Sequence, residues 1–341
     1  MEWEKARHML PASQNTTAPA RPAPRYGPVD AFEAPRYTGI KTFARCPHIS
    51  DPDGVDVAVV GVPFDTATSF RAGARFAPEA IRAGSALLRP YHPVLDVDVF
   101  AGQSVVDWGD IAVTPGNGER TTAQIAEALG GVLAAGVVPI TLGGDHSILL
   151  GVLRAQGAVH GPVGLVLLDA HADTWEQYYG ETFFHGTVFK RAVEEGLIAP
   201  ERSVMAGMRG SLYGPEDLEV PRSMGFEVIP GDALRGLPAA EFGRLVRDRL
   251  GDAPPYLSFD IDVVDPAYAP GTGTPEVGGL SAPEALGFLR ALAGIDFRGF
   301  DVVEVSPPYD SAGQVTALIA ANVAYEFLAL RAIAADSAGR A

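Results

Sequence analysis

The chain has 341 residues, 47% hydrophobic and 20% charged, which is enough apolar material for one large α/β domain or two smaller ones. Its 42 acidic and 26 basic residues give a net charge of −16, and this balance argues against a nucleic-acid partner, which normally requires a basic face. Cys46 is the only cysteine, so an internal disulfide is excluded and a reducing compartment fits.

The two ends of the chain lack the patterns of membrane targeting. The first ten residues are charged and contain no apolar segment typical of a secretory signal. The longest charge-free stretch near the C-terminus, 312–325, is shorter than the roughly 20 residues that span a bilayer. We therefore expect a cytoplasmic protein without a membrane partner.

In chain order, the sequence begins with a segment unlike the rest. Residues 1–36 are rich in Pro, Ala and polar residues, which predicts an extended or disordered N-terminal arm that could also pack on a neighbouring subunit. No internal repeat or change of composition follows, so residues 37–341 are expected to form a single domain.

Strand-like and helix-like patterns alternate from residue 56 onward. The expected strands are 56–63, 104–108, 137–142, 163–168, 203–206, 227–229, 256–260 and 299–305. The expected helices are 78–88, 121–135, 147–156, 189–196, 239–250, 282–293 and 314–335. This alternation predicts a three-layer α/β/α fold with a mostly parallel central sheet, buried on both faces.

Three short motifs contain six candidate metal ligands, each motif following an apolar run. The ligands are His146 in Gly-Gly-Asp-His-Ser, Asp169, His171 and Asp173 in Asp-Ala-His-Ala-Asp, and Asp260 and Asp262 in Ser-Phe-Asp-Ile-Asp. Alternate residues of a strand point the same way, so each set is expected to project from one face. Ligands gather at the carboxyl ends of parallel strands, which predicts one shared site. Four carboxylates and two imidazoles exceed the needs of one tetrahedral zinc ion and suit two harder divalent ions bridged by carboxylates.

Other acidic pairs are interpreted as structural. Asp96 and Asp98 also alternate, but no histidine is near them, so a solvated strand or turn is expected. Asp107 and Asp110 flank Trp108-Gly109 and are interpreted as turn and capping residues. Asp265 precedes Pro266 and is interpreted as a turn residue or a neighbour of the ligands.

Several motifs of this chain closely resemble the ureohydrolase family. They are the three ligand motifs, Gly61-Val-Pro-Phe-Asp65, Gly73-Ala-Arg-Phe76, the run 258–279 and Glu304-Val-Ser-Pro-Pro308. The family is the arginase/agmatinase superfamily, whose members hydrolyse guanidino or related groups at a two-manganese centre. The resemblance covers roughly residues 37–335. Gly-Thr-Gly-Thr-Pro-Glu (271–276) is similar to the agmatinase, guanidinobutyrase and proclavaminate amidinohydrolase branch. Ala72 and Ala77 stand where relatives often have Pro and Gly, which leaves the pocket shape open.

The resemblance implies a role for each ligand. His146, Asp169, Asp173 and Asp260 would hold one ion, and Asp169, His171, Asp260 and Asp262 the other, so that Asp169 and Asp260 bridge. Two Mn²⁺ ions are expected, with Ni²⁺ or another divalent ion possible. The ion pair would lower the pKa of a shared water, and Asp173 would orient the resulting hydroxide.

The resemblance also supplies residues for the substrate. Glu304 matches the acid that binds the guanidinium, and His185 in Phe184-His-Gly-Thr matches the catalytic histidine that protonates the leaving amine. In the loop 174–184, Trp175 and Tyr178 are expected to form part of the wall of the substrate pocket. Arg71 or Arg209 would favour a carboxylate tail on the substrate, whereas Glu176 or Glu181 would favour an amine.

The expected reaction is the release of urea and an amine from a small guanidino compound, with agmatine and putrescine as the first choice. The alternatives are 4-guanidinobutyrate, another guanidino acid or free guanidine. A non-catalytic homologue is disfavoured by the complete ligand set, and a single-zinc deacetylase by the additional ligands. The family also implies a homo-trimer or homo-hexamer.

Overall fold

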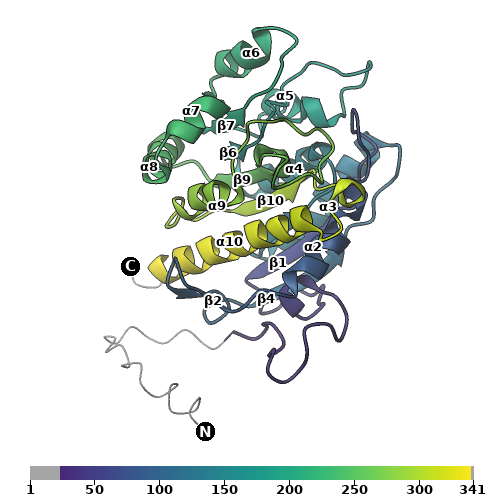
Figure 1. Ribbon diagram of the computed structural model, residues 1–341, viewed down its shortest axis with the longest axis vertical. Helices are drawn as coiled ribbons and strands as arrows, with labels where there is room; N and C mark the ends of the chain where they lie inside the picture. Colours follow the sequence, from purple (N-terminus) through teal and green to yellow (C-terminus); the bar gives the residue numbers. More distant parts are fainter. Residues whose placement is uncertain (1–23, 339–341) are drawn as a thin grey trace.

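The computed structural model describes residues 24–338 and contains one eight-stranded sheet in the order β4-β1-β5-β10-β9-β6-β7-β8 (Figure 1). The strands are β1 (Val57–Gly61), β4 (Val105–Asp110), β5 (Val138–Leu142), β6 (Gly164–Leu168), β7 (Val204–Met208), β8 (Glu227–Pro230), β9 (Pro255–Asp260) and β10 (Gly299–Val303). All seven neighbouring pairs are parallel. The predicted fold class is therefore confirmed.

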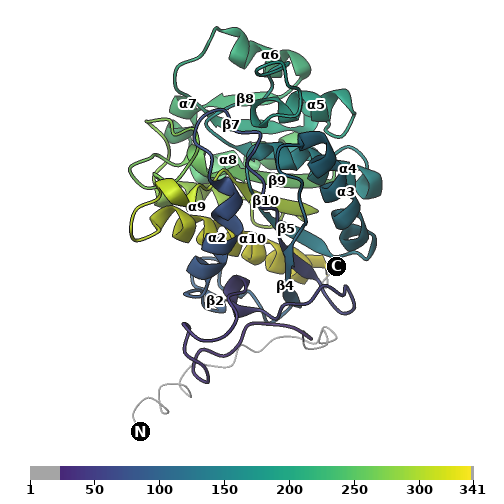
Figure 2. The same ribbon diagram turned by 90° about the vertical axis from the view of Figure 1, so that its right-hand side faces the viewer.

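Helices cover both faces of this sheet, as Figure 2 shows with α2 and α9 on one side and α3 and α4 on the other. One layer contains α2 (Ala77–Ser85), α7 (Gly231–Gly236), α8 (Ala239–Leu250), α9 (Ala282–Arg290) and α10 (Val315–Ala338). The other contains α3 (Gly118–Ala134), α4 (Leu149–His160), α5 (Val188–Glu194) and α6 (Glu216–Met224). Each layer has its own hydrophobic core, because the central strands are buried on both faces.

The sequence patterns predicted the eight strands and all helices except α6 and α7. Helix α6 is polar and contains Pro221, and α7 has only six residues, so neither carries a strong 3.6-residue apolar pattern. The structure also adds a small hairpin of β2 (Tyr91–His92) and β3 (Val97–Asp98). Asp98 lies exposed in this hairpin, which agrees with the interpretation as a solvated strand or turn.

Asp107 makes the turn contact expected of it, since its carboxylate accepts the N–H of Gly109 at 2.9 Å, but it also has buried partners that the sequence did not predict. Asp107 is 1% exposed, and its carboxylate accepts hydrogen bonds from Arg82 at 2.8 and 3.0 Å and from the backbone N–H of Phe43 at 2.7 Å. Arg82 also contacts Asp110 at 2.6 Å. The two acids thus form a partly buried ion-pair network that ties the segment before β1 and helix α2 to β4.

In the described part of the predicted arm, residues 24–36, the backbone of Arg25 and Tyr26 lies next to the start of β4. The backbone N–H of Arg25 donates to Ser104 Oγ at 2.7 Å, and the N–H of Val105 donates to the carbonyl of Tyr26 at 3.2 Å. The remainder of the arm, 1–23, lies outside the described residues.

Helix α10 is more apolar than the charge-free stretch suggested. Within the described chain, its segment Val315–Ser337 is long and apolar enough to cross a membrane, with a mean hydropathy of 1.5 over its best window. However, 72% of that window is buried inside the structure, and the helix packs on α2, α9 and β10. Packing in the protein core therefore accounts for its apolar surface.

Candidate metal centre and substrate cavity

The six candidate ligands follow three strands in the middle of the sheet. His146 follows β5, Asp169 follows β6 and Asp260 ends β9, while β10, which lies between β5 and β9, leads into Glu304. The carboxyl ends of these four adjacent strands meet at one edge of the sheet, so the predicted site residues come together there.

The reason given for the alignment of the ligands was wrong, because Asp260 is the last residue of its strand and the other ligands lie in turns beyond the strand ends. Strand β6 ends at Leu168, and the carboxylate of Asp169 accepts the N–H of His171 at 2.6 Å. The carboxylate of Asp260 accepts the N–H of Asp262 at 2.9 Å in the same way. These short Asx-type turns, rather than strand alternation, bring the ligands to one place.

Two groups of side chains have the spacing of metal sites, and they share Asp169. His146, Asp169 and Asp260 form one group, and Asp169, His171 and Asp262 form the other, with the ligand atoms of each within 4.8 Å of one another. Asp173 Oδ2 lies 3.1 Å from His146 Nδ1 and so adjoins the first group. The shared residue fits the predicted bridge at Asp169. Bridging by Asp260, which belongs to one group alone, stays a prediction.

The imidazole of His146 is oriented for a ligand at Nδ1. Its Nε2 lies 3.0 Å from Ser258 Oγ, whose hydroxyl donates to Asp301 Oδ1 at 2.8 Å. Because Ser258 uses its proton on Asp301, it accepts one from His146 Nε2. The neutral ring therefore presents the Nδ1 lone pair to the carboxylates of the first group, an arrangement typical of metal-binding histidines.

The buried carboxylates of the site require compensating positive charge. Nδ1 of His146 and Oδ2 of Asp169 are buried without a well-formed hydrogen bond, although they lie 3.2 Å apart. Burial, reinforced by Asp262 and Asp173, raises the pKa of Asp169 to about 8, and burial together with Asp262 and Asp169 raises the pKa of Asp260. A protein does not keep this many carboxylates together unless positive charge compensates them. The donor set thus fits a pair of oxygen-preferring divalent ions.

These pKa shifts predict that metal binding releases protons near pH 7. Burial lowers the pKa of His171, but Asp262 outweighs it and raises that pKa to about 10. Asp169 and His171 both hold protons at pH 7 when metal-free, and both must lose them to bind metal, so apparent affinity for Mn²⁺ should rise from pH 6 to 9. Calorimetric titration in buffers of different ionisation enthalpy measures the release. A binding heat that is the same in every buffer would contradict the prediction.

His185 and Glu304 form a buried pair beside the metal groups. Nδ1 of His185 lies 2.9 Å from Glu304 Oε1, which also accepts the N–H of His146 at 2.9 Å. The other oxygen, Glu304 Oε2, is buried and has no hydrogen-bond partner among the described residues. Burial lowers the pKa of His185, but the Glu304 carboxylate outweighs it and raises that pKa to about 9. The pair thus has one unused carboxylate oxygen and a histidine whose pKa is raised by that carboxylate.

Backbone strain is concentrated at this site. Asp173 and Glu304 are two of the few described non-glycine residues with a positive φ, at 48° and 62°. Such conformations cost of order 1–3 kcal/mol and persist where the surrounding contacts require them. Close approach of the backbone is also needed at Gly144, where a Cβ would lie 1.8 Å from the carbonyl oxygen of Phe64. The Gly-Gly-Asp-His-Ser turn therefore depends on this glycine.

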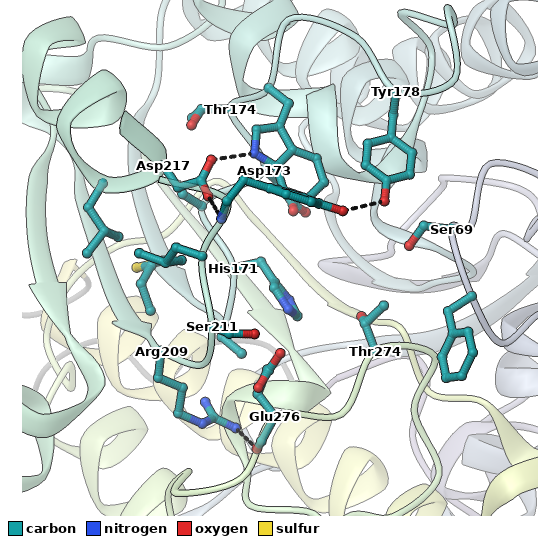
Figure 3. A pocket seen from close by; sticks show the side chains of 18 of the residues that line it. Ser69, His171, Asp173, Thr174, Tyr178, Arg209, Ser211, Asp217, Thr274 and Glu276 are labelled. Carbon is teal, nitrogen blue, oxygen red and sulfur yellow. Dashed lines mark hydrogen bonds between the residues drawn. The ribbon is translucent and has the colours of Figure 1, made fainter. Parts of the chain in front are cut away.

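A cavity of about 440 Å³ opens over the second metal group (Figure 3). Its wall includes His171 and Asp173 on one side and Ser69 and Thr274 on another. The aromatic part of the wall is formed by Phe70, Trp175, Tyr178 and Tyr213. Trp175 stacks on Tyr178, with ring centroids 5.0 Å apart, and donates its indole N–H to Asp217 at 2.8 Å. The predicted aromatic wall is thus present and held in place.

The structure gives Arg209 a different role from the one that the sequence suggested. Arg209 lines the cavity, but its guanidinium donates to the carbonyl oxygens of Asp262 at 2.5 Å and Glu276 at 2.7 Å. These bonds hold two loops together and use the donors that a substrate carboxylate would need. Glu176, considered as a partner for an amine, is ion-paired with Lys190 and Arg191 of α5 instead.

Three residues of the site were missed by the sequence reasoning. Ser258 and Asp301 orient His146, and Ser69 contacts His185 Nε2 through its hydroxyl at 2.8 Å. The sequence around Asp301 could have predicted its role, because an acid inside the apolar run 299–305 must have a buried partner. Ser69 lies in a loop without such a pattern, so only the structure identifies it.

Comparison with known proteins agrees with this geometry. The model of the arginase family matches residues 55–330. The chain is 45% identical to guanidinobutyrase of Pseudomonas aeruginosa, over 88% of this chain and 95% of that protein. It is 44% identical to mitochondrial agmatinase of Gallus gallus, over 92% of each. The structure of proclavaminate amidinohydrolase from Streptomyces clavuligerus superposes with a TM-score of 0.84 at 42% identity, covering 88% of this chain and all of the other. The chain therefore belongs to the arginase family.

Proposed function

We propose that this protein hydrolyses a guanidino compound to urea and an amine, with agmatine as the preferred substrate. The observation that carries the proposal is the pair of ligand groups sharing Asp169, next to the free oxygen of Glu304 and below an open cavity. When bound, a pair of divalent ions supplies the nucleophile by lowering the pKa of a water molecule.

The residues of the chain provide the rest of the chemistry. The carboxylate of Glu304, 1% exposed, binds the planar guanidinium by charge-assisted hydrogen bonds through Oε2. Asp173, whose Oδ2 faces His146, orients the attacking water. His185, which lies between Glu304 and Ser69, serves as the acid for the leaving amine.

The charges around the cavity favour a cationic tail over a carboxylate tail. Beyond the metal ligands, Asp217 and Glu276 line the cavity, and the carboxylate of Glu276 makes no hydrogen bond or ion pair within the described part of the chain. Arg209, the lining cation, is occupied by backbone carbonyls. The aromatic wall suits an alkyl chain ending in an ammonium group. This combination matches agmatine better than 4-guanidinobutyrate.

A substrate panel tests the proposal. The protein loaded with Mn²⁺ is assayed for urea with agmatine, 4-guanidinobutyrate, 3-guanidinopropionate, arginine and free guanidine. We expect the highest kcat/KM with agmatine. A preference for a guanidino acid would overturn the assignment of the tail, and the absence of urea from every compound would overturn the reaction.

The metal and the assembly are part of the same proposal. Manganese is favoured because four of the six ligands are carboxylates, and loading with Mn²⁺, Ni²⁺ or Zn²⁺ in turn compares their activities. A homo-trimer or homo-hexamer is supported by the exposed apolar side chains of Phe32, Tyr37 and Ile40, at 92%, 85% and 85%. Light scattering measures the assembly, and a monomer would contradict it.

A further inference from the structure

Asp301 is an acid buried in the middle of the central sheet. It lies in β10, is 0% exposed, and pairs in register with Thr141 of β5 on one side and Ser258 of β9 on the other. No lysine or arginine forms an ion pair with Asp301 in the described chain. A carboxylate in such a place is costly unless specific contacts compensate it. The contacts of Asp301 therefore indicate its role.

Two hydrogen bonds connect Asp301 to the first ligand group. The hydroxyl of Ser258 donates to Asp301 Oδ1 at 2.8 Å, and Ser258 Oγ lies 3.0 Å from His146 Nε2. On the other side of the ring, His146 Nδ1 lies 3.1–3.3 Å from three carboxylates of the metal centre. Asp301, Ser258 and His146 are all 0% exposed, so solvent does not screen the charge of Asp301 from the ring.

The surroundings of Asp301 favour its ionised form at neutral pH. Burial raises its pKa to about 6, and the charge of His146 and the hydrogen bond from Ser258 limit this rise. The other polar side chains beside it, Thr141 and Tyr256, end in uncharged hydroxyl groups. A negative charge thus lies one hydroxyl group away from the metal-binding histidine.

We propose that Asp301 is a positioning residue for the metal ion of the first ligand group, and that it acts through its negative charge. This inference rests on the two-metal centre of the proposed function. The carboxylate accepts the proton of Ser258, so the hydroxyl oxygen accepts the Nε2 proton of His146 and the Nδ1 lone pair stays directed at the ion. The charge also raises the basicity of the imidazole as a ligand.

The second ligand group has no equivalent relay. The side chain of its imidazole, His171, is 29% exposed and lines the substrate cavity, and its Nε2 forms no hydrogen bond within the described residues. Loss of the charge at Asp301 should therefore weaken the binding of one ion and leave the other in place.

The test compares Mn²⁺ binding to wild-type protein, Asp301→Asn, Ser258→Ala, the double variant and a control, Thr141→Val. Asparagine keeps an oxygen that can accept the Ser258 hydroxyl, so Asp301→Asn removes the charge and retains the acceptor. Thr141 is buried in the same row of the sheet, and its hydroxyl has no hydrogen-bond partner among the described residues. Thr141→Val thus removes a buried polar group outside the relay. Calorimetric titration of metal-free protein measures the Kd of each ion.

We expect Asp301→Asn to raise the Kd of one Mn²⁺ ion by about 10- to 100-fold and to leave the other unchanged. Ser258→Ala should show at least the same loss. The double variant should bind no more weakly than Ser258→Ala, because the charge acts through that hydroxyl. Thr141→Val should bind both ions like wild-type protein. Metal-free Asp301→Asn should melt no lower than metal-free wild-type protein, since a buried charge is replaced by a neutral group of the same shape.

The outcomes distinguish this inference from the proposed function. If wild-type protein binds two Mn²⁺ ions and Asp301→Asn binds both with the same Kd, the role of the charge is wrong and the metal centre stands. An equal loss in Thr141→Val would assign the effect to packing of the sheet, and a further loss in the double variant would show a route other than Ser258. Both results overturn the relay. If wild-type protein binds no Mn²⁺, the proposed metal centre itself fails.

Discussion

Asp169→Asn is expected to remove both metal ions and to lower kcat/KM by at least about 10³-fold, or about 4 kcal/mol. Asp169 belongs to both ligand groups, and it is completely buried. Asparagine has the same size, but it carries no charge and replaces one coordinating oxygen with an NH₂ group. Elemental analysis of the purified variant and a urea assay measure the two effects together.

The stability of the metal-free variant distinguishes loss of metal from misfolding. Burial raises the pKa of Asp169 to about 8, so the metal-free fold loses stability as the pH rises from the unfolded pKa of about 3.9 to the folded pKa, and the full penalty persists above pH 8. The neutral asparagine removes this penalty. The metal-free variant should therefore melt no lower at pH 8 than metal-free wild-type protein. Asp98→Asn, in the exposed β2–β3 hairpin, is the matched control and should keep both metal and activity.

Asp260→Asn determines whether Asp260 is a second bridge. Asp260 groups with His146 and Asp169, and its buried carboxylate lies 3.3 Å from His146 Nδ1. If it bridges, as the resemblance implies, the variant should lose both ions and its turnover. Retention of one ion per chain would confine Asp260 to one metal, and retained activity would remove it from the bridging role.

The sequence predicted the sheet well because each strand is a short apolar run between turn residues. Gly164–Leu168, for example, is buried at every position, so its pattern reflects two covered faces. The order of the strands was not predictable, since the adjacency of β5, β10, β9 and β6 depends on long-range packing. That adjacency nevertheless places Glu304 between the other motifs.

The structure brings the predicted ligands together in one place, whereas several of their neighbours have contacts that the sequence did not predict. Charged residues after buried strands require compensation, which is a local signal. The commitment of Arg209 to the carbonyls of Asp262 and Glu276 and the burial of Asp107 against Arg82 depend on contacts between distant segments. A charged residue near a motif can equally bind a substrate or hold a loop, and only the contacts decide between the two.

Glu304→Gln should separate substrate binding from metal binding. In wild-type protein, Oε1 accepts hydrogen bonds from His146 and His185, while the buried Oε2 lies 3.3 Å from where a Cβ on Gly273 would be. Glutamine can keep the acceptor at Oε1, so we expect the fold and both ions to be retained. The guanidinium, however, would meet a neutral amide in place of a carboxylate.

The expected loss for Glu304→Gln is about 10²- to 10³-fold in kcat/KM, or about 3–4 kcal/mol, because a buried charge pair loses one partner. The pH profile should change as well. The Glu304 carboxylate is the main cause that raises the pKa of His185 to about 9, so its removal lowers that pKa. Activity that depends on protonated His185 is present below this pKa and lost above it, and the alkaline limb of kcat should therefore move to lower pH. A variant that keeps the wild-type kcat/KM would exclude Glu304 as the guanidinium anchor, while an unshifted alkaline limb would show that His185 is not the acid for the leaving amine.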